Sequence, residues 1–157
     1  MPCRAFRGPK KTPDGRMGLN TIRENPKRAE SRQKILVFGN PLVAADSIAL
    51  RLIAPLQKKF PGILFKEFDA AENLEKEGRN LIILDSAVGL DNVAMLDDLD
   101  RISTCQPCSM HDFDLALTLK LLKKMGAIDS VRIIAVPSDY PLSKALKETS
   151  RIISNII

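Results

Sequence analysis

The chain has 157 residues with a formal net charge of +5, and 45% of its residues are hydrophobic. This length corresponds to about one domain, and no apolar run approaches the ~20 residues of a membrane-spanning helix. The first residues lack the apolar segment of a secretory signal, and three cysteines do not make a disulfide framework. The sequence therefore predicts a cytoplasmic globular protein that does not bind membranes.

The positive charge is concentrated at the N-terminus. Residues 1–34 hold ten Lys/Arg and three Asp/Glu, and residues 35–157 hold fourteen and sixteen, so the two parts carry +7 and −2. The first part has few large apolar residues and many Gly and Pro, so we predict a disordered basic extension over 1–33 and a folded domain over 34–157. A basic extension can tether nucleic acid or an acidic partner, but Phe6 is the sole aromatic residue among its charges. We therefore favour a solvated extension without nucleic-acid binding.

The first half of the domain shows strand and helix patterns in turn. An apolar run at 35–38 predicts a buried strand, and apolar residues at helical spacing predict a helix over 48–60 that contains Pro55. Alternation of apolar and polar residues predicts a strand at 63–68. A short polar helix over 70–77 and a buried strand at 81–84 follow.

The second half continues this pattern. We expect a strand at 93–96, a loop or single turn at 97–100, a helix over 112–125, a strand at 131–136 and a helix over 142–153. Asp112 is the expected N-cap of the first of these helices, and Gly126 ends it. Such alternation of strands and helices is typical of an α/β sheet that is covered on both faces.

Two acids follow the predicted buried strands. Asp85 comes directly after the apolar run 81–84, and Asp46 follows Gly39-Asn40-Pro41-Leu42, which closes the first run. Ligands gather at the carboxyl ends of strands in open α/β sheets, so we expect both acids at one crevice. A turn residue that bonds its own backbone is the alternative for Asp85, and a helix N-cap is the alternative for Asp46. Asn40 is expected to organise the loop through its amide.

The single histidine, His111, lies just before the predicted helix 112–125. A lone histidine is more often a structural or surface residue than a ligand. At a helix start, however, a neutral imidazole can face a crevice, and it is the commonest metal ligand. Together with Asp46 and Asp85 it makes a three-ligand set that suits zinc or nickel and leaves positions open for a substrate.

Other motifs are less informative. Cys105-Gln106-Pro107-Cys108 has the spacing of a redox pair or a thiolate metal clip, but we favour a loop with incidental cysteines, because no second cysteine pair is present. The sequence contains no dinucleotide fingerprint, no P-loop and no Gly-x-Ser-x-Gly elbow. A nucleotide-dependent enzyme is therefore disfavoured.

The order of these motifs resembles that of the NiFe-hydrogenase maturation endopeptidases. The resemblance rests on Gly39-Asn40-Pro41-Leu42 with an acid behind it, on Leu-Ile-Ile-Leu-Asp ending at Asp85, and on Ser-x-His-Asp around His111. It covers about residues 34–157. It implies an α/β fold, a three-layer αβα sandwich around a five-stranded, mostly parallel sheet.

The resemblance also implies an activity. Members of the family remove the C-terminal extension of the hydrogenase large-subunit precursor after nickel has been inserted. Their metal-contacting residues fall on Asp46, Asp85 and His111, which we expect to act both in catalysis and as ligands of nickel carried by the substrate. The attacking water is activated by a carboxylate base or by the metal, and the protein is expected to be a monomer.

One loop departs from the family pattern. The family usually has Gly-Asp-acid-Gly where this chain has Ala44-Ala45-Asp46-Ser47, so the first acid and both glycines are missing. The departure leaves a second hypothesis open, a non-catalytic, nickel-sensing binding module or chaperone of hydrogenase assembly. A third hypothesis is an unrelated α/β enzyme that acts on a small molecule.

Overall fold

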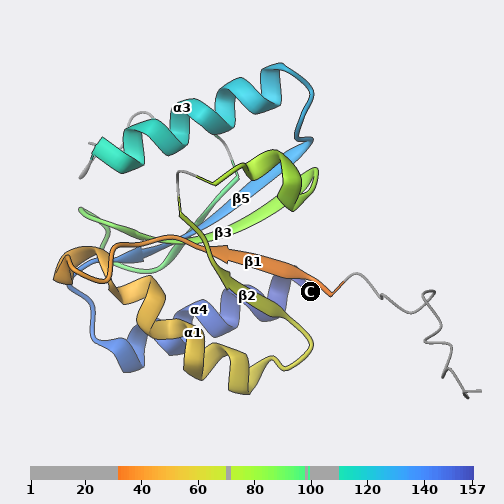
Figure 1. Ribbon diagram of the computed structural model, residues 1–157. Coiled ribbons are helices and arrows are strands. Elements are labelled where there is room, and N and C mark those ends of the chain that lie inside the picture. Colours follow the sequence, from red (N-terminus) through yellow and green to blue (C-terminus); the bar gives the residue numbers. More distant parts are fainter. Residues whose placement is uncertain (1–31, 70–71, 98, 100–109) are drawn as a thin grey trace, which may run out of the picture. The chain divides into compact units, whose positions relative to one another are not determined.

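The central sheet has five strands in the order β2-β1-β3-β5-β4 (Figure 1). These strands are β1 (Lys34–Val37), β2 (Leu64–Glu67), β3 (Asn80–Ala87), β4 (Ala94–Leu96) and β5 (Ser130–Pro137). β1 pairs in parallel with β2 and with β3, and β3 pairs in parallel with β5. β4 runs antiparallel to β5 at the edge of the sheet. The structure, a computed structural model, describes residues 32–69, 72–97, 99 and 110–157, with the backbone alone at 110–114.

Helices cover both faces of this sheet. The α-helices are α1 (Ile48–Lys59), α3 (Met110–Lys124) and α4 (Leu142–Ile156), and the short 3-10 helices are η2 (Ala44–Asp46) and η3 (Leu74–Glu77). In Figure 1, α1 and α4 lie against one face and α3 lies against the other. The predicted three-layer αβα sandwich around a five-stranded, mostly parallel sheet is therefore confirmed.

Alternate residues of the first strand build two separate cores. Ile35 and Val37 pack with α1 and α4, whereas Leu36 and Phe38 pack with residues of α3. All four side chains are at most 6% exposed. Because the strand is buried on both faces, its sequence is an unbroken apolar run and does not alternate with polar residues.

The strand predicted at 81–84 is longer than expected. β3 extends from Asn80 to Ala87, so Asp85 does not close the strand but lies within it, opposite Ala135 of β5. The backbone ladder with β5 continues to Ala87 and Pro137, past the end of the apolar run. Pairing with a long neighbour, and not hydrophobicity, therefore sets the end of this strand.

The polar helix predicted over 70–77 is shorter than expected. It is the 3-10 helix η3, in which Leu74 alone is buried, so a longer helix would have no apolar face to stabilise it. The side chain of Asn73 caps it by accepting a hydrogen bond from the backbone N–H of Glu75 at 3.0 Å. Gly78, with φ +123°, ends it as predicted.

The helix predicted over 112–125 begins earlier than expected. α3 starts at Met110, so the N-cap prediction for Asp112 is wrong, and His111 lies inside the first turn and not before it. The predicted end is confirmed. Gly126 has φ +72°, and the N–H groups of Gly126 and Ala127 donate to the carbonyls of Lys123 and Leu122, an ending that favours glycine.

Some predictions concern residues outside those described. These are the extension over 1–33 except for its last two residues, the pair Cys105 and Cys108, and part of the acidic stretch 97–100. Within the described ranges, none of the helices has the length and apolar character that a membrane span requires.

The Glu77 carboxylate connects the first two strands. Lys34 at the start of β1 donates to its Oε2 at 2.5 Å, and Lys66 in β2 donates to its Oε1 at 2.8 Å. The Glu77 side chain is 11% exposed, and the two lysines are 29% and 36% exposed. The hydrogen bonds from Lys34 and then from Lys66 lower the pKa of Glu77 below its ordinary value.

We expect Glu77→Gln to lower the free energy of unfolding by about 1–2 kcal/mol near neutral pH, because two ammonium groups lose their carboxylate while remaining partly solvated. Since folding lowers the pKa of Glu77, its stabilisation is complete above the unfolded value of about 4.3 and is lost as the pH falls through the folded value. Urea unfolding at about pH 7 and about pH 3 measures this effect. Glu75→Gln, at an exposed position of the same turn, is the control. Equal losses of unfolding free energy in both variants at neutral pH would contradict a stabilising role of the Glu77 carboxylate.

Candidate functional site

The carboxyl ends of β1, β2 and β3 surround a cavity of about 600 Å³. Its lining comes from residues 38–41, Asp46, residues 67–69, Glu72, Asp85 and Leu115. The three strands are adjacent and parallel, so their carboxyl ends lie at one edge of the sheet. The two acids that the sequence singles out, Asp46 and Asp85, thus line the same cavity.

A tight loop returns the chain from the end of β1 to Asp46. The Asn40 N–H donates to the Asp46 carbonyl at 3.2 Å, and the Asp46 N–H donates to the Val43 carbonyl at 3.0 Å. The Asn40 side-chain oxygen accepts from the Leu42 N–H at 2.9 Å, and the Asn40 carbonyl accepts from the Val43 N–H at 3.1 Å. Asn40 therefore organises this loop, as its position in the sequence predicts.

Gly39 is required where the loop closes on the strand. Its φ is +146°, and a Cβ at this position would collide with the carbonyl oxygen of Asp46 and press against the Leu50 side chain at 3.2 Å. Glycine alone tolerates both the dihedral angle and the close approach. The glycine that ends the first apolar run thus brings Asp46 to the cavity.

The alternative role of Asp46 as a helix cap does not describe its position. Ser47 occupies the N-cap of α1, and Asp46 is the last residue of η2. The Ser47 hydroxyl donates back to the Ala44 carbonyl at 2.9 Å and accepts no hydrogen bond from the helix. The half-buried Asp46 side chain borders the cavity.

Asp85 reaches the cavity from within β3. Leu81 and Ile83 belong to the core beneath α3, and side chains two residues apart in a strand share a face, so Asp85 lies on this face as well. Its Oδ1 accepts from the N–H of the next residue, Ser86, at 2.8 Å, whereas a turn-forming Asp accepts from the N–H two residues on. No turn follows, because the pairing with β5 continues to Ala87.

His111 lies in the first turn of α3, and its side chain is outside the described atoms. Leu115, four residues later, lines the cavity and is 7% exposed. Residues four apart lie on the same helix face, so the backbone places His111 one turn beyond a residue of the cavity wall. Figure 1 agrees, since the loop after β1 and the first turns of α3 lie toward the same end of the sheet.

The structure brings two of the three predicted ligands together. Among the side chains that it describes, no three His, Cys, Asp or Glu are arranged to hold a metal ion. Asp46 and Asp85 supply two carboxylates to one cavity, and a set completed by His111 remains a prediction.

The cavity is strongly acidic. Its carboxylates are those of Asp46, Glu67, Asp69, Glu72 and Asp85, and its described lining includes no Lys or Arg. Lys66 pairs with Glu72 from outside the lining, at 3.5 Å. Closely spaced carboxylates in a concave site produce a negative potential that attracts cations. The cavity therefore suits a metal ion or another positively charged group.

Sequence reasoning missed Glu67, Asp69 and Glu72. A signal was present for the first two, because they stand at the carboxyl end of the strand predicted at 63–68, as Asp85 does for the strand predicted at 81–84. The missing information was the strand order, which places β2 directly beside β1.

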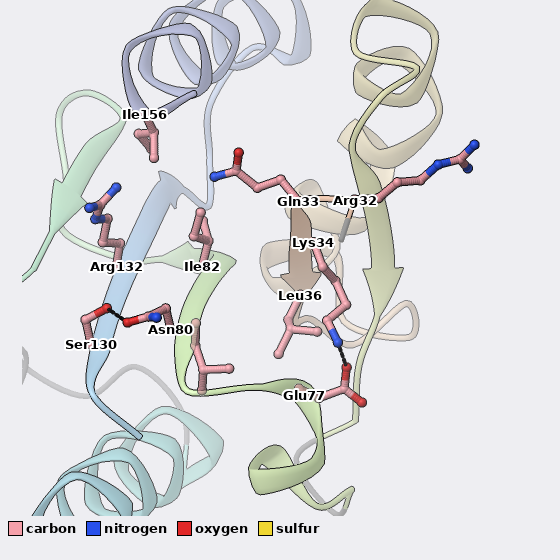
Figure 2. A pocket seen from close by; sticks show the side chains of 11 residues that line it. Arg32, Gln33, Lys34, Leu36, Glu77, Asn80, Ile82, Ser130, Arg132 and Ile156 are labelled. Carbon is pink, nitrogen blue, oxygen red and sulfur yellow. Dashed lines mark hydrogen bonds and ion pairs between the residues drawn. The ribbon is translucent and has the colours of Figure 1, made fainter. Parts of the chain in front are cut away.

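A second cavity, of about 670 Å³, lies at the opposite edge of the sheet, where the strands begin (Figure 2). Several of its polar side chains pair with one another, Lys34 with Glu77 and Ser130 with Asn80. Neither Asp46 nor Asp85 lines it. The cavity at the carboxyl edge is therefore the candidate site.

Solved structures with the same architecture include three hydrogenase maturation proteins. The maturating endopeptidase HybD from Escherichia coli superposes with a TM-score of 0.59 at 18% identity, over 79% of this chain and 93% of that one. The fold is that of the hydrogenase maturation proteases. HybD from Thermococcus kodakarensis gives a TM-score of 0.55 at 13% identity over 79% and 98% of the chains. A hydrogenase 3 maturation protease gives a TM-score of 0.55 at 18% identity over 76% and 87%.

Similarity at these identities establishes a common fold with the hydrogenase maturation proteases. By sequence alone, the chain matches no protein-family model and no curated protein. The fold predicted from Gly39-Asn40, Asp85 and His111 is thus confirmed by structure, and not by overall sequence similarity.

We expect Gly39→Ala to lower the free energy of unfolding by about 2–4 kcal/mol, because an unfavourable φ and a collision with the Asp46 carbonyl add to one another. Gly78→Ala is the matched control, since Gly78 has φ +123° but open space around its Cα. It should cost about 1–2 kcal/mol, the dihedral strain alone. Urea unfolding of both variants measures the difference. Equal losses of unfolding free energy would show that the close approach of Gly39 to the Asp46 carbonyl does not constrain the loop.

Proposed function

We propose that the protein is an endopeptidase that removes the C-terminal extension of a NiFe-hydrogenase large-subunit precursor after nickel insertion. The observation that carries the proposal is the presence of Asp46 and Asp85 at one acidic cavity, beside the helix α3, whose first turn contains His111. The fold shared with proteins named hydrogenase maturation endopeptidases supports it. In this proposal the protein acts in the cytoplasm as a monomer, without nucleic acid or membrane.

The nickel in this proposal belongs to the substrate. Imidazole and carboxylate groups are ligands that nickel accepts, and three of them leave positions for ligands of the precursor itself. The acidic cavity favours a precursor that carries the metal cation over one that does not. Asp46, Asp85 and His111 would therefore make cleavage depend on completed metal insertion.

Peptide hydrolysis also requires an activated water molecule. One route uses a carboxylate of Asp46 or Asp85 as the general base, within the same cavity that holds the metal. The other route uses water polarised by the nickel of the substrate. Both routes place the scissile bond beside the metal centre, at the carboxyl edge of the sheet.

A second candidate function is a non-catalytic, nickel-sensing module of hydrogenase assembly. The observation that favours it is Ala44-Ala45, which stands where the resembling family has Gly-Asp. Such a module would use the same cavity to bind the loaded precursor and would leave its extension intact.

Mass spectrometry of the large-subunit precursor, incubated with the purified protein, tests the enzymatic proposal. The nickel-loaded precursor should lose the mass of its extension, and the nickel-free precursor should not. Asp46→Asn, Asp85→Asn and His111→Ala should each slow the reaction by roughly a hundredfold or more, because each removes a metal contact or a base. Their thermal unfolding is recorded alongside, so that loss of fold is separated from loss of activity.

Asp139→Asn is the matched control, because Asp139 is an exposed acid that follows β5 at the same edge and does not line the cavity. It should cleave at the wild-type rate. Binding of the loaded precursor without a change in mass would favour the assembly module. Cleavage at the wild-type rate by Asp85→Asn and His111→Ala would contradict the roles proposed for these residues, and a wild type that neither binds nor trims the precursor would favour the small-molecule enzyme.

A further inference from the structure

The loop beside the candidate site has an apolar surface. Its residues are Pro41, Leu42, Val43, Ala44 and Ala45, all of them apolar and all exposed. Leu42 is 92% exposed and Val43 is 47% exposed. A run of exposed apolar residues is unfavourable on the surface of a soluble domain unless function requires it.

Hydrogen bonds hold this apolar loop in one shape. The N–H groups of Leu42 and Val43 both donate to Asn40, and the Val43 carbonyl accepts from the Asp46 N–H at 3.0 Å. The turn is therefore closed on both sides of Leu42. A side chain presented on an ordered backbone loses little entropy when it meets a partner, so the loop is pre-organised for contact.

The apolar loop is continuous with the acidic cavity. Asn40 and Pro41 at one end of the loop, and Asp46 just past its other end, line the cavity. Leu42 and Val43 project between these two points of attachment. A molecule that fills the cavity and extends beyond it would therefore meet the apolar loop.

One position of the loop, Ala45, reflects the departure from the family pattern. The resembling proteins usually carry an acid at the position of Ala45, whereas the run from Pro41 to Ala45 has no charged or polar side chain. An apolar partner can thus approach the loop without burying a carboxylate that has no counter-ion, which would be costly.

We propose that residues 41–45 form a docking platform for an apolar patch of the protein substrate next to its scissile extension. This inference rests on the proposed function and names the surface that recognises the substrate as a protein. The carboxylates of the cavity suit a cation but make no favourable contact with apolar side chains. A pre-organised apolar side chain such as that of Leu42 supplies the apolar contact with the substrate.

Leu42→Ser tests the platform against the nickel-loaded large-subunit precursor. We expect KM for removal of the extension, and Kd for the precursor, to rise roughly tenfold to a hundredfold, with kcat unchanged, because the leucine contributes binding away from the scissile bond. The thermal unfolding temperature should not change, since the side chain is 92% exposed in the free protein.

Leu117→Ser is the matched control, since Leu117 is 58% exposed on α3 and does not line the cavity. Its KM and Kd should equal those of the wild type. An unchanged KM in Leu42→Ser, with a wild type that trims the precursor, overturns the platform and leaves the proposed function standing. Equal increases in both variants would also overturn the platform, because they indicate non-specific apolar adhesion. A wild type that neither binds nor trims the precursor overturns the proposed function, and the platform with it.

Discussion

The parallel pairing of β1 with both β2 and β3 determines where the proposed functional groups lie. Because the three strands run in one direction, the chain leaves each of them at the same edge of the sheet. The ladders continue just past the strand ends, with the Phe38 N–H donating to the Leu84 carbonyl and the Phe68 N–H to the Val37 carbonyl, both at 2.9 Å. The start of each loop is thereby held by its neighbour. The acidic cavity follows from strand direction more than from any single loop.

The fold was predictable because buried parallel strands have a simple sequence signal. Runs such as 35–38 are apolar throughout, since each is covered on both faces, and amphipathic helical segments lie between them. The ends of elements were less predictable, because they depend on partners that are distant in sequence. β3 continues past its apolar residues to Ala87 only because β5 lies beside it. For the same reason the acids at the end of β2 could not be assigned to the site before the strand order was known.

The loop after β1 shows a different limit of sequence reasoning. Gly39 and Asn40 predict a turn, and they make it through a close approach and a side-chain hydrogen bond. The apolar residues that follow would be expected inside the protein on hydropathy alone. They are exposed because the chain must return at once to Asp46, whose backbone is bonded to Asn40, and so short a closed loop cannot fold back over the core. Backbone closure therefore outweighs hydrophobic burial at this position.

In the proposed function, the same loop separates two kinds of recognition. Charge in the cavity would act over a distance and discriminate a metal-bearing group from a neutral one, whereas apolar contact at the rim would act over short range and discriminate between protein surfaces. An acid at the position of Ala45 would place negative charge on the apolar rim as well as in the cavity. This carboxylate would have to be desolvated each time an apolar partner docked. With alanine there, the negative charge stays in the cavity, where a cation can compensate it. The proposed substrate is therefore a protein with a cationic centre beside an apolar surface, and this proposal makes the departure from the family pattern a feature of substrate selection.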